Sequence, residues 1–318
     1  MFEKALIPTD FSRYSHKMQE CIAEIPGLKE VVLLNVLDAS NPMNLEKSGW
    51  SYNSLISDAE TRLKEQVESL SRSGKSGLIV KSLLKVIVEP MSGADGVNLQ
   101  RLEPRSDAGL IYGGSVAEAI QKTAQEENVS LIIMGAKGKG LVEGILLGSV
   151  STEVLRHGET DLLLIRHQVL EGNEEKSLAK FCPNIFSRLL VTTDFSPAAQ
   201  EAVSLVKGLE GIFEILLVHV ITKGEDFNKA AQSLSLMRDE LAGSGSKITV
   251  HILEGDPAEE ILNLARKQDV SLLIISSQGK GWLKQIRMGS VSFDVARRTD
   301  RPLLVVRQSK SLVAYGSA

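Results

Sequence analysis

The chain has 318 residues, of which 43% are hydrophobic and 24% charged, and its 36 basic and 40 acidic side chains give a net charge of −4. This length is about twice the ~150 residues of a typical domain, so two domains are expected, and the composition excludes a largely disordered chain. The slight acidic excess argues against a nucleic-acid-binding protein, and no apolar run approaches the ~18 residues of a membrane-spanning helix.

Nothing at the start of the chain resembles a targeting sequence, because the first residues lead straight into a strand-like segment. The two cysteines, Cys21 and Cys182, belong to no CxxC motif or Cys/His cluster. Such spacing argues against a disulfide framework or a zinc site and favours two small buried side chains. These features together predict a cytoplasmic protein.

The first half of the chain alternates short apolar runs with longer amphipathic stretches. The apolar runs are rich in Val, Ile and Leu and end at turn residues, which is typical of strands buried on both faces of a parallel sheet. They are Ala5–Ile7, Val31–Val36, Leu131–Met134 and Leu162–Ile165. Helical spacing is found in Ser12–Ile25, Asp58–Ser71 and Ser115–Glu127. In the last of these, Ser115 and Glu118 have the spacing of a capping box.

The second half of the chain repeats the first. Lys4–Ser12 corresponds to Arg188–Ser196, which makes Asp10 and Asp194 equivalent at an offset of 184 residues. Later blocks, such as Gly148–Ser151 and Gly289–Ser292, correspond at an offset of 141. Because the offset falls from 184 to 141, the first copy holds 43 residues more than the second between these blocks. The chain is therefore interpreted as a duplicated domain with an elaborated first copy.

The alternation of strands and helices predicts an α/β fold of two tandem, doubly wound domains with parallel sheets. The first domain is expected at residues 1–168 and the second at 185–318, with a polar linker at 169–184. Helices of the second copy are expected at Ala198–Leu209, Lys229–Gly243 and Pro257–Gln268. The first copy carries insertions near 41–52 and 90–107, expected as loops, and Lys81–Glu89 is compatible with a further strand.

The segment with the clearest chemistry follows the strand Leu131–Met134. Gly135 and Gly138 are followed after nine residues by Gly148-Ser149-Val150-Ser151, which leads into a helix-like run. Glycines at the carboxyl end of a parallel strand let backbone N–H groups approach a phosphate with no Cβ in the way. The helix start adds unpaired N–H groups, the positive end of the helix dipole and two hydroxyl groups. This pattern predicts a site for the phosphates of a nucleotide.

Asp10 is the candidate for the other side of this site, since it follows the first strand and so lies at the same edge of the sheet. Its carboxylate can accept hydrogen bonds from ribose hydroxyls or from an exocyclic amine. The alternative is that Asp10 caps the helix beginning near Ser12. One residue can do both, and the sequence leaves the two roles open.

The strand ending at Asp10 and the Gly-x2-Gly-x9-Gly-Ser pattern resemble the universal stress protein family, specifically its ATP-binding branch, and both copies show the full order of blocks. The resemblance implies tandem five-stranded domains of a Rossmann-like, adenine nucleotide alpha hydrolase-like fold. It implies ATP or another adenine nucleotide such as AMP as the ligand, which Mg²⁺ or Mn²⁺ can accompany. It assigns base and ribose contacts to Pro8, Thr9, Asp10 and Val36. It assigns ribose and phosphate contacts to Met134, Gly135, Lys137 and Gly138, and phosphate contacts to Gly148, Ser149, Val150 and Ser151.

The second copy keeps most of this pattern. Its equivalent residues are Thr192, Thr193, Asp194, Val220, Ser276, Ser277, Gly279, Gly289, Ser290, Val291 and Ser292, and His219 is expected to pack beside Asp194. The departure is Ser276, which stands where the first copy has Gly135. If that position needs a positive φ, a serine there costs about 1 kcal/mol or more and weakens the site. If the backbone is ordinary, Ser276 adds a hydroxyl donor and the site survives.

Other nucleotide motifs fit poorly. Gly138-Lys-Gly140 lacks the register of a dinucleotide fingerprint, and Gly74-Lys75-Ser76 lacks the leading glycine of a Walker A motif. No nucleophile–base pair can be assembled from spacing, so a stress-response regulator that binds adenine nucleotides is favoured over an enzyme. The alternatives are a slow ATPase or nucleotide-dependent transferase, and a structural pseudo-dimer for protein partners with a degenerate second site.

Single domains of the family commonly pair through their last strands. The resemblance therefore implies an intramolecular pseudo-dimer in which Asp161–Arg166 lies against Arg301–Arg307. Such pairing protects an otherwise exposed sheet edge. A homodimer of the tandem chain is an expectation that the sequence does not decide, and neither nucleic acid nor a membrane is expected as a partner.

Overall fold

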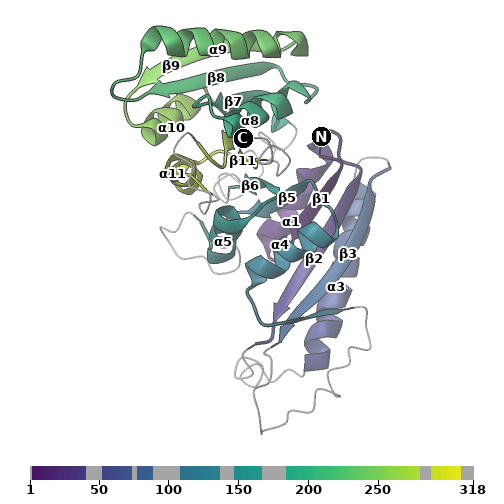
Figure 1. Ribbon diagram of the computed structural model, residues 1–318. Helices are drawn as coiled ribbons and strands as arrows, with labels where there is room; N and C mark the ends of the chain where they lie inside the picture. Colours follow the sequence, from purple (N-terminus) through teal and green to yellow (C-terminus); the bar gives the residue numbers. More distant parts are fainter. Residues whose placement is uncertain are drawn as a thin grey trace, which may run out of the picture.

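The computed structural model describes residues 2–40, 52–73, 77–88, 108–136, 147–166, 184–279 and 288–308, and shows an α/β protein (Figure 1). The first half contains β1 (Lys4–Pro8), α1 (Arg13–Glu20), η1 (Ile22–Glu24), β2 (Glu30–Asp38), α3 (Tyr52–Ser73), β3 (Ile79–Val88), β4 (Gly109–Tyr112), α4 (Val116–Glu126), β5 (Leu131–Gly135), α5 (Ser149–His157) and β6 (Asp161–Ile165). The second half contains β7 (Arg188–Thr192), α8 (Pro197–Lys207), β8 (Glu214–Ile221), α9 (Phe227–Leu241), η4 (Ala242–Ser244), β9 (Lys247–Glu254), α10 (Pro257–Lys267), β10 (Leu272–Ser276), α11 (Ser290–Arg298) and β11 (Leu303–Val306).

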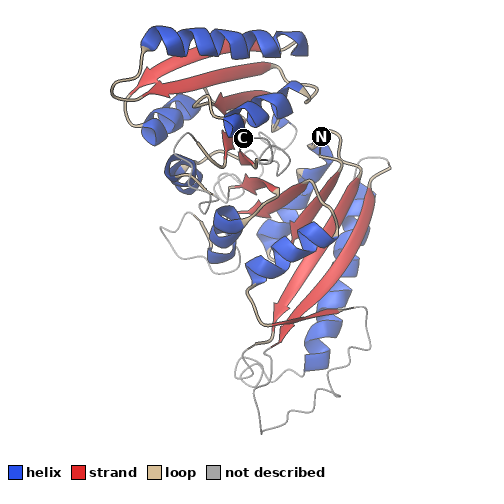
Figure 2. Ribbon diagram, in the orientation of Figure 1, coloured by secondary structure: helices blue, strands red, loops and turns tan. Residues whose placement is uncertain are grey.

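The strands of both halves form one sheet of eleven strands in the order β4-β3-β2-β1-β5-β6-β11-β10-β7-β8-β9, and Figure 2 shows this sheet running through the whole molecule. Its strand pairs are parallel except for β6 and β11, which pair antiparallel with Leu163 opposite Leu304. The expected pairing of the two last strands is therefore present within the chain.

Each half is doubly wound, as predicted. The order β3-β2-β1-β5-β6 in the first half and its equivalent β9-β8-β7-β10-β11 in the second mean that the winding reverses beside β1 and β7. Loops that leave the carboxyl ends of the two central strands turn in opposite directions at such a point, which leaves a crevice between them. The topology thus provides one crevice in each half.

The first half has a sixth strand in addition to the five expected. Strand β4 extends the outer edge of the sheet by pairing with β3, with Tyr112 opposite Val88. Its apolar run is only Leu110 and Ile111, which is too short to distinguish from a loop by sequence pattern. Part of the additional length of the first copy therefore serves to widen the sheet.

Both faces of the sheet are apolar, and helices from both halves cover each face. Helices α1, α3, α8 and α9 pack on one face through residues such as Met18, Leu63, Val203 and Leu234. Helices α4, α5, α10 and α11 pack on the other through Ile120, Leu155, Ile261 and Val295. Successive strand side chains alternate between the two faces, so a strand covered on both sides is apolar throughout. This explains the unbroken apolar runs in the sequence.

The helix starts follow side-chain caps that the sequence contains. Ser12 caps α1 and its repeat equivalent Ser196 caps α8, while Ser115 and Glu118 form the predicted capping box of α4. Helix α3 begins earlier than predicted, at Tyr52. Among the described helices, none combines the length and apolar character needed to cross a membrane. The expected loops near 41–52 and 90–107 and the linker at 169–184 lie almost wholly outside the described residues.

Cys21 requires a correction to the sequence interpretation. It follows α1, is buried, and is disulfide-bonded rather than being a simple apolar side chain. Cys182, the other cysteine of the chain, lies outside the described residues. No CxxC motif or other short cysteine spacing accompanies Cys21, which is why the pattern did not indicate the bond.

Candidate functional site

The first half has a cavity of about 660 Å³, here called cavity one, at the carboxyl ends of β1, β2 and β5. It occupies the crevice where the winding reverses, and helices α1, α3, α4 and α5 complete its wall. Every predicted site residue of this half that the structure describes lines it, namely Pro8, Thr9, Asp10, Val36, Met134, Gly135, Gly148, Ser149, Val150 and Ser151. Lys137 and Gly138 lie outside the described residues.

The carboxylate of Asp10 is oriented by the turn after β1. Its Oδ1 accepts a hydrogen bond from the N–H of Ser12 at 3.0 Å, and Oγ1 of Thr9 accepts one from the N–H of Phe11 at 3.2 Å. Phe11 has a φ of 59°, which is uncommon for a bulky residue and marks a constrained turn. The cap of α1 is Ser12 itself, so Asp10 supports the helix start while its side chain also lines the cavity.

A buried asparagine on the neighbouring strand holds the same turn in place. The N–H of Thr9 donates to the Leu34 carbonyl at 2.8 Å, and Nδ2 of Asn35 donates to the Thr9 carbonyl at 2.8 Å. Thr9 and Asn35 are 5% and 4% exposed. Because buried polar groups need hydrogen-bond partners, this pair of bonds fixes the position of Thr9 and therefore of Asp10.

Helix α5 begins at cavity one without a side-chain cap. Its N-cap is Gly148, which has no side chain to accept from the first-turn N–H groups of Ser149, Val150 and Ser151. Helices α1, α4, α8, α9 and α10 instead begin with a capping Ser or Asp. The hydroxyl of Ser151 donates to the Gly135 carbonyl at 2.9 Å and so fastens the helix to β5. An uncapped helix start at a cavity is a ready-made site for an anion.

The second half has a cavity of about 470 Å³, here called cavity two, in the equivalent place. Most residues of the predicted second site line it, namely Thr192, Thr193, Asp194, Val220, Ser276, Gly279, Gly289, Ser290, Val291 and Ser292. Ser277 is the exception, because it is buried and does not line the cavity. Its N–H donates to the Val306 carbonyl and its carbonyl accepts from the N–H of Gly289, both at 2.8 Å. Ser277 therefore stabilises the cavity wall through main-chain hydrogen bonds without lining the cavity.

The aspartate turn is reproduced in the second half, and it explains one glycine of the motif. Oδ1 of Asp194 accepts from the N–H of Ser196 at 3.0 Å, and Phe195 has a φ of 63°. A Cβ on Gly279 would lie 2.5 Å from Oδ2 of Asp194. A side chain here would displace the loop or the aspartate, so this glycine makes room for Asp194 in addition to the phosphate role expected from sequence.

Ser276 occupies its position without strain. It ends β10, and among the described residues only Phe11, Asn128, Phe195 and Asp269 combine a side chain with a positive φ. Its hydroxyl donates to the Gln278 carbonyl at 2.9 Å. Of the two alternatives that the sequence left open, the ordinary backbone is the one observed, and the loop itself uses the added hydroxyl.

The walls of the two cavities differ on the side of the second strand. In cavity one, α3 contributes Asp58 and Arg62, whose Oδ2 and Nε lie 3.0 Å apart, and the Arg62 guanidinium lies 5.7 Å from the ring centre of Phe11. In cavity two, the loop between β8 and α9 contributes Thr222 and Glu225 instead. Each cavity thus has two carboxylates in its wall, but only the lining of cavity one, the larger of the two, includes an arginine.

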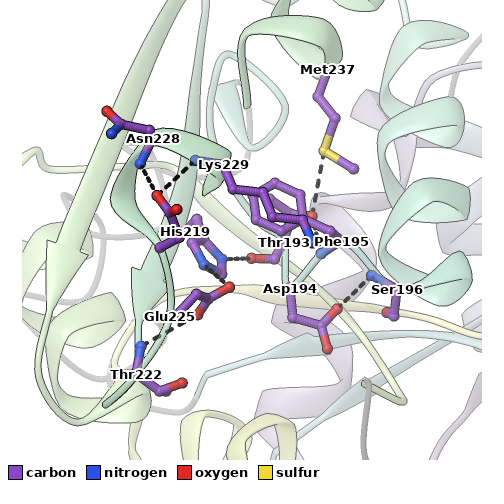
Figure 3. A network of polar contacts seen from close by, with 11 residues as sticks. Thr193, Asp194, Phe195, Ser196, His219, Thr222, Glu225, Asn228, Lys229 and Met237 are labelled. Carbon is purple, nitrogen blue, oxygen red and sulfur yellow. Dashed lines mark hydrogen bonds and ion pairs between the residues drawn. The ribbon is translucent and has the colours of Figure 1, made fainter. Parts of the chain in front are cut away.

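His219 joins the Glu225 carboxylate to the aspartate turn, as Figure 3 shows. Its Nδ1 lies 2.8 Å from the Thr193 carbonyl and its Nε2 lies 3.1 Å from Oε1 of Glu225, while its ring centre lies 4.4 Å from that of Phe195 with the planes tilted by 41°. His219 therefore links the carbonyl that precedes Asp194 to a carboxylate of the neighbouring turn.

His219 lies beside the Asp194 turn, as predicted from sequence, whereas its equivalent in the first half, Asn35, was not identified from sequence. A signal for Asn35 was present, because it is the one polar residue in the apolar run Val31–Val36 and lies at the repeat offset of 184 from His219. Both side chains bond the carbonyl before the aspartate, at 2.8 Å in each half. The repeat therefore preserves the hydrogen bond while the residue type changes.

Comparison with known proteins finds relatives along the whole chain. The model of the Universal stress protein family matches residues 1–166 and 186–307. The chain is 23% identical over 317 residues to Universal stress protein Rv1996 of Mycobacterium tuberculosis (strain ATCC 25618 / H37Rv), covering 95% of this chain and 94% of that protein. A crystal structure of a universal stress protein from Archaeoglobus fulgidus DSM 4304 has a TM-score of 0.68 and 25% identity, covering 97% of this chain and 100% of the other.

Two further matches are universal stress proteins with bound nucleotides. One is solved in complex with cAMP, and the other, from Archaeoglobus fulgidus, in complex with dAMP. Each covers 39% of this chain at 21% identity, and they cover 98% and 99% of their own chains with TM-scores of 0.33 and 0.31. Adenine-nucleotide binding is thus a property of these two proteins, and the similarity is too low to transfer a ligand to this chain.

Proposed function

The chain belongs to the universal stress protein family, and from that premise we propose that cavities one and two each bind an adenine nucleotide. Nucleotide occupancy, rather than a chemical reaction, is the output of the protein. The chain is in this proposal a regulatory binding module that carries two sites in a single polypeptide.

One observation carries the proposal. In both halves an oriented aspartate and a glycine-capped helix start line the same cavity, with Asp10 and α5 in the first half and Asp194 and α11 in the second. A nucleotide has anionic phosphates at one end and hydroxyl-bearing ribose and an apolar base at the other. Its recognition therefore needs N–H donors and carboxylate acceptors within one cavity, and each cavity contains both.

The phosphates are proposed to bind at the starts of α5 and α11. The first-turn N–H groups there are directed out of the helix and coincide with the positive end of its dipole. Because the N-caps are Gly148 and Gly289, no capping side chain competes with an anion for these donors. The hydroxyls of Ser149 and Ser290 line the same ends of the cavities and supply further donors.

The ribose and base are proposed to bind at the first two strands. The carboxylates of Asp10 and Asp194 accept hydrogen bonds from ribose hydroxyls. The turns that follow β1 and β7 hold both carboxylates in a fixed orientation for this contact. The base packs on apolar side chains that line the cavities, including Val36 and Met134 in the first half and Val220 in the second. Apolar walls with a few placed polar groups are the usual composition of such sites.

The first test is the number of nucleotides that one chain binds. Nucleotide-free protein is titrated with ATP, ADP and AMP up to millimolar concentration by calorimetry, with and without Mg²⁺ or Mn²⁺. Two bound nucleotides per chain support the proposal, and no binding of any of them contradicts it. One nucleotide per chain favours the alternative of a degenerate second site, and phosphate release that Asp10→Ala abolishes favours a slow ATPase.

The second test assigns the sites. Asp10→Asn and Asp194→Asn keep an oxygen that accepts from the N–H of Ser12 or Ser196, so the turns are retained while the charged acceptor is lost. Each is expected to weaken nucleotide binding about tenfold in its own half, the typical size of one charge-assisted hydrogen bond. Asp239→Asn is the matched control, because this carboxylate lies on α9 and is 62% exposed. Equal effects of all three variants would contradict the assignment.

A further inference from the structure

Two equivalent arginines lie where the halves of the protein meet. Arg166 directly follows β6 and Arg307 directly follows β11, and the two correspond at the repeat offset of 141. These are the strands that pair antiparallel in the middle of the sheet. Both arginines are buried, with 3% and 7% exposure, and neither lines cavity one or cavity two. Nucleotide binding as proposed above does not account for two buried arginines here.

Each arginine crosses to the other half and bonds the end of a helix there. The guanidinium of Arg307, in the second half, donates to the carbonyls of Leu155 at 2.6 Å and Val154 at 3.3 Å in α5 of the first half. The guanidinium of Arg166, in the first half, donates to the carbonyl of Ala296 in α11 of the second half. Leu155 and Ala296 are also equivalent at the offset of 141. The two contacts therefore form a symmetric, crossed pair.

The helices held in this way are the two that begin at the cavities. The last four carbonyls of an α-helix have no partner within the helix, and a cation at that end also complements the helix dipole. Helices α5 and α11 each have nine residues, which makes them rigid rods of about 13 Å. A constraint on the carboxyl end of so short a helix also sets the position and direction of its amino end.

The charge of these arginines is retained despite their burial. Burial lowers the pKa of Arg166 to about 10, which leaves it cationic at neutral pH. Removing a cation from water costs several kcal/mol unless strong hydrogen bonds offset the loss. The helix carbonyls supply such bonds, and the Arg156 guanidinium of α5 lies 4.0 Å from the ring centre of Phe293 of α11, so side chains of the two helices are also in contact.

We propose that Arg307 and Arg166 are crossed positioning residues: Arg307 of the second half positions the start of α5 in cavity one, and Arg166 of the first half positions the start of α11 in cavity two. Neither half would then form its site unaided, and displacement of one phosphate-binding helix would be transmitted to the other half. The role of the helix starts in nucleotide binding rests on the proposed function, whereas the crossed positioning itself does not.

The positioning is tested without any ligand, by hydrogen–deuterium exchange of the full chain. Arg307→Met removes the donors to α5 but keeps the main-chain N–H that bonds Asp161. We expect amide exchange about tenfold faster in α5 and unchanged in α11, because bonds from a charged donor are lost in α5 alone. Arg166→Met is expected to give the reverse pattern.

Matched variants separate this effect from general destabilisation. Arg238→Met removes an exposed cation of α9 that pairs with Asp239, at 48% exposure, and is expected to leave both patterns unchanged. Arg307→Lys and Arg166→Lys keep the charge and provide a milder test should a methionine variant fail to fold. Faster exchange in both helices to the same degree, or in the helix of the variant's own half, would overturn the proposal.

The second arm adds ATP to the same samples. If cavities one and two bind nucleotide, ATP slows exchange at the starts of α5 and α11 in the unaltered protein. Arg307→Met is then expected to raise the ATP concentration that protects α5 about tenfold, and Arg166→Met the concentration that protects α11. An absence of protection in the unaltered protein would refute nucleotide binding, while the ligand-free pattern would still decide the crossed positioning. Weaker binding in the cavity of the variant's own half would contradict the proposal.

Discussion

The two cavities agree closely where the chain turns after the first strand and differ where the second strand ends. In both halves the aspartate accepts from the main chain at 3.0 Å, and the next residue, Phe11 or Phe195, is left-handed. The neighbouring side chain that bonds the preceding carbonyl is Asn35 in one half and His219 in the other. The duplication has therefore conserved a hydrogen-bond geometry more strictly than the residues that supply it.

The difference follows from what surrounds each position. Asn35 in cavity one lies near α3, whose Asp58 and Arg62 form an ion pair of their own. His219 in cavity two lies against Glu225 of a turn, and a histidine there can bond both the carbonyl and the carboxylate. A donor to the carbonyl is required in each half, whereas the second partner is free to vary. Five substitutions test how far this equivalence extends.

The largest effect is expected at Asp161, which has no counterpart in the second half because Pro302 stands at the equivalent position. Burial raises the pKa of the Asp161 carboxyl to about 6, although the main-chain N–H of Arg307 donates to it at 2.7 Å. The folded chain therefore binds a proton here more tightly than the unfolded chain. It follows that the contribution of Asp161 to the free energy of unfolding falls as the pH rises from about 4 to about 6.

Asp161→Asn keeps an acceptor for Arg307 and removes the buried charge. We expect it to raise the free energy of unfolding by about 2–3 kcal/mol at a pH above ~7, and by progressively less as the pH falls toward ~4. Urea denaturation of both proteins at a series of pH values measures the difference. An increment that does not depend on pH would show that the carboxyl has an ordinary pKa in the folded chain.

Gly279→Ala is expected to have the next largest effect, and in cavity two alone. The new Cβ would lie 2.5 Å from Oδ2 of Asp194, so either the loop or the aspartate must move. Overpacking of this kind costs about 1–3 kcal/mol, which corresponds to roughly tenfold to hundredfold weaker nucleotide binding. Titration of this variant should show one site at its original affinity and one weakened. Unchanged affinity at both sites would mean that Asp194 takes no part in binding.

Ser151→Ala and Ser292→Ala should have smaller effects, equal in the two halves. The Ser151 hydroxyl donates to the Gly135 carbonyl at 2.9 Å, and the Ser292 hydroxyl to the Ser276 carbonyl at 2.8 Å. Loss of one such bond is expected to lower the free energy of unfolding by about 1 kcal/mol. Denaturant unfolding of the two variants measures this directly. A difference of more than ~1 kcal/mol between them would show that the helix starts are held differently.

Ser276→Gly should have the smallest effect, although it restores the residue of the first half. Ser276 has an ordinary backbone and bonds the Gln278 carbonyl within its own loop. A glycine in a strand is expected to lower the free energy of unfolding by about 0.5–1 kcal/mol, with less than about threefold change in nucleotide affinity at cavity two. A large gain in affinity, measured by the same calorimetry, would revive the idea that the serine impairs the second site.

Most of the fold and of the candidate site could be predicted because their signals are local or repeated. The apolar runs, the Ser115 capping box and the spacing from Gly135 to Ser151 each lie within a few residues of sequence, and the duplication presents each signal twice. Strand β4 could not be predicted, since its run of two apolar residues resembles a loop. The disulfide of Cys21 was missed for a related reason, because no short spacing accompanies it.

The roles of side chains that contact distant segments could not be predicted for a different reason. Glu225 lines cavity two through a turn whose position depends on β8 and α9, and Arg62 lines cavity one through the packing of α3. Arg166 and Arg307 are ordinary strand-end residues in sequence, and their partners lie in helices of the opposite half. Contacts of this kind exist only after the two halves have paired along β6 and β11.

The sequence by itself determined the duplication, the doubly wound α/β class and the motif residues that meet at the carboxyl edge of each half, because periodicity and spacing are properties of consecutive residues. Only the tertiary structure decided that β4 widens the sheet to eleven strands, that Gly279 makes room for Asp194, and that each glycine-capped helix ends against an arginine of the other half. Those features depend on distances between segments far apart in the chain, and the packing of the whole sheet sets these distances.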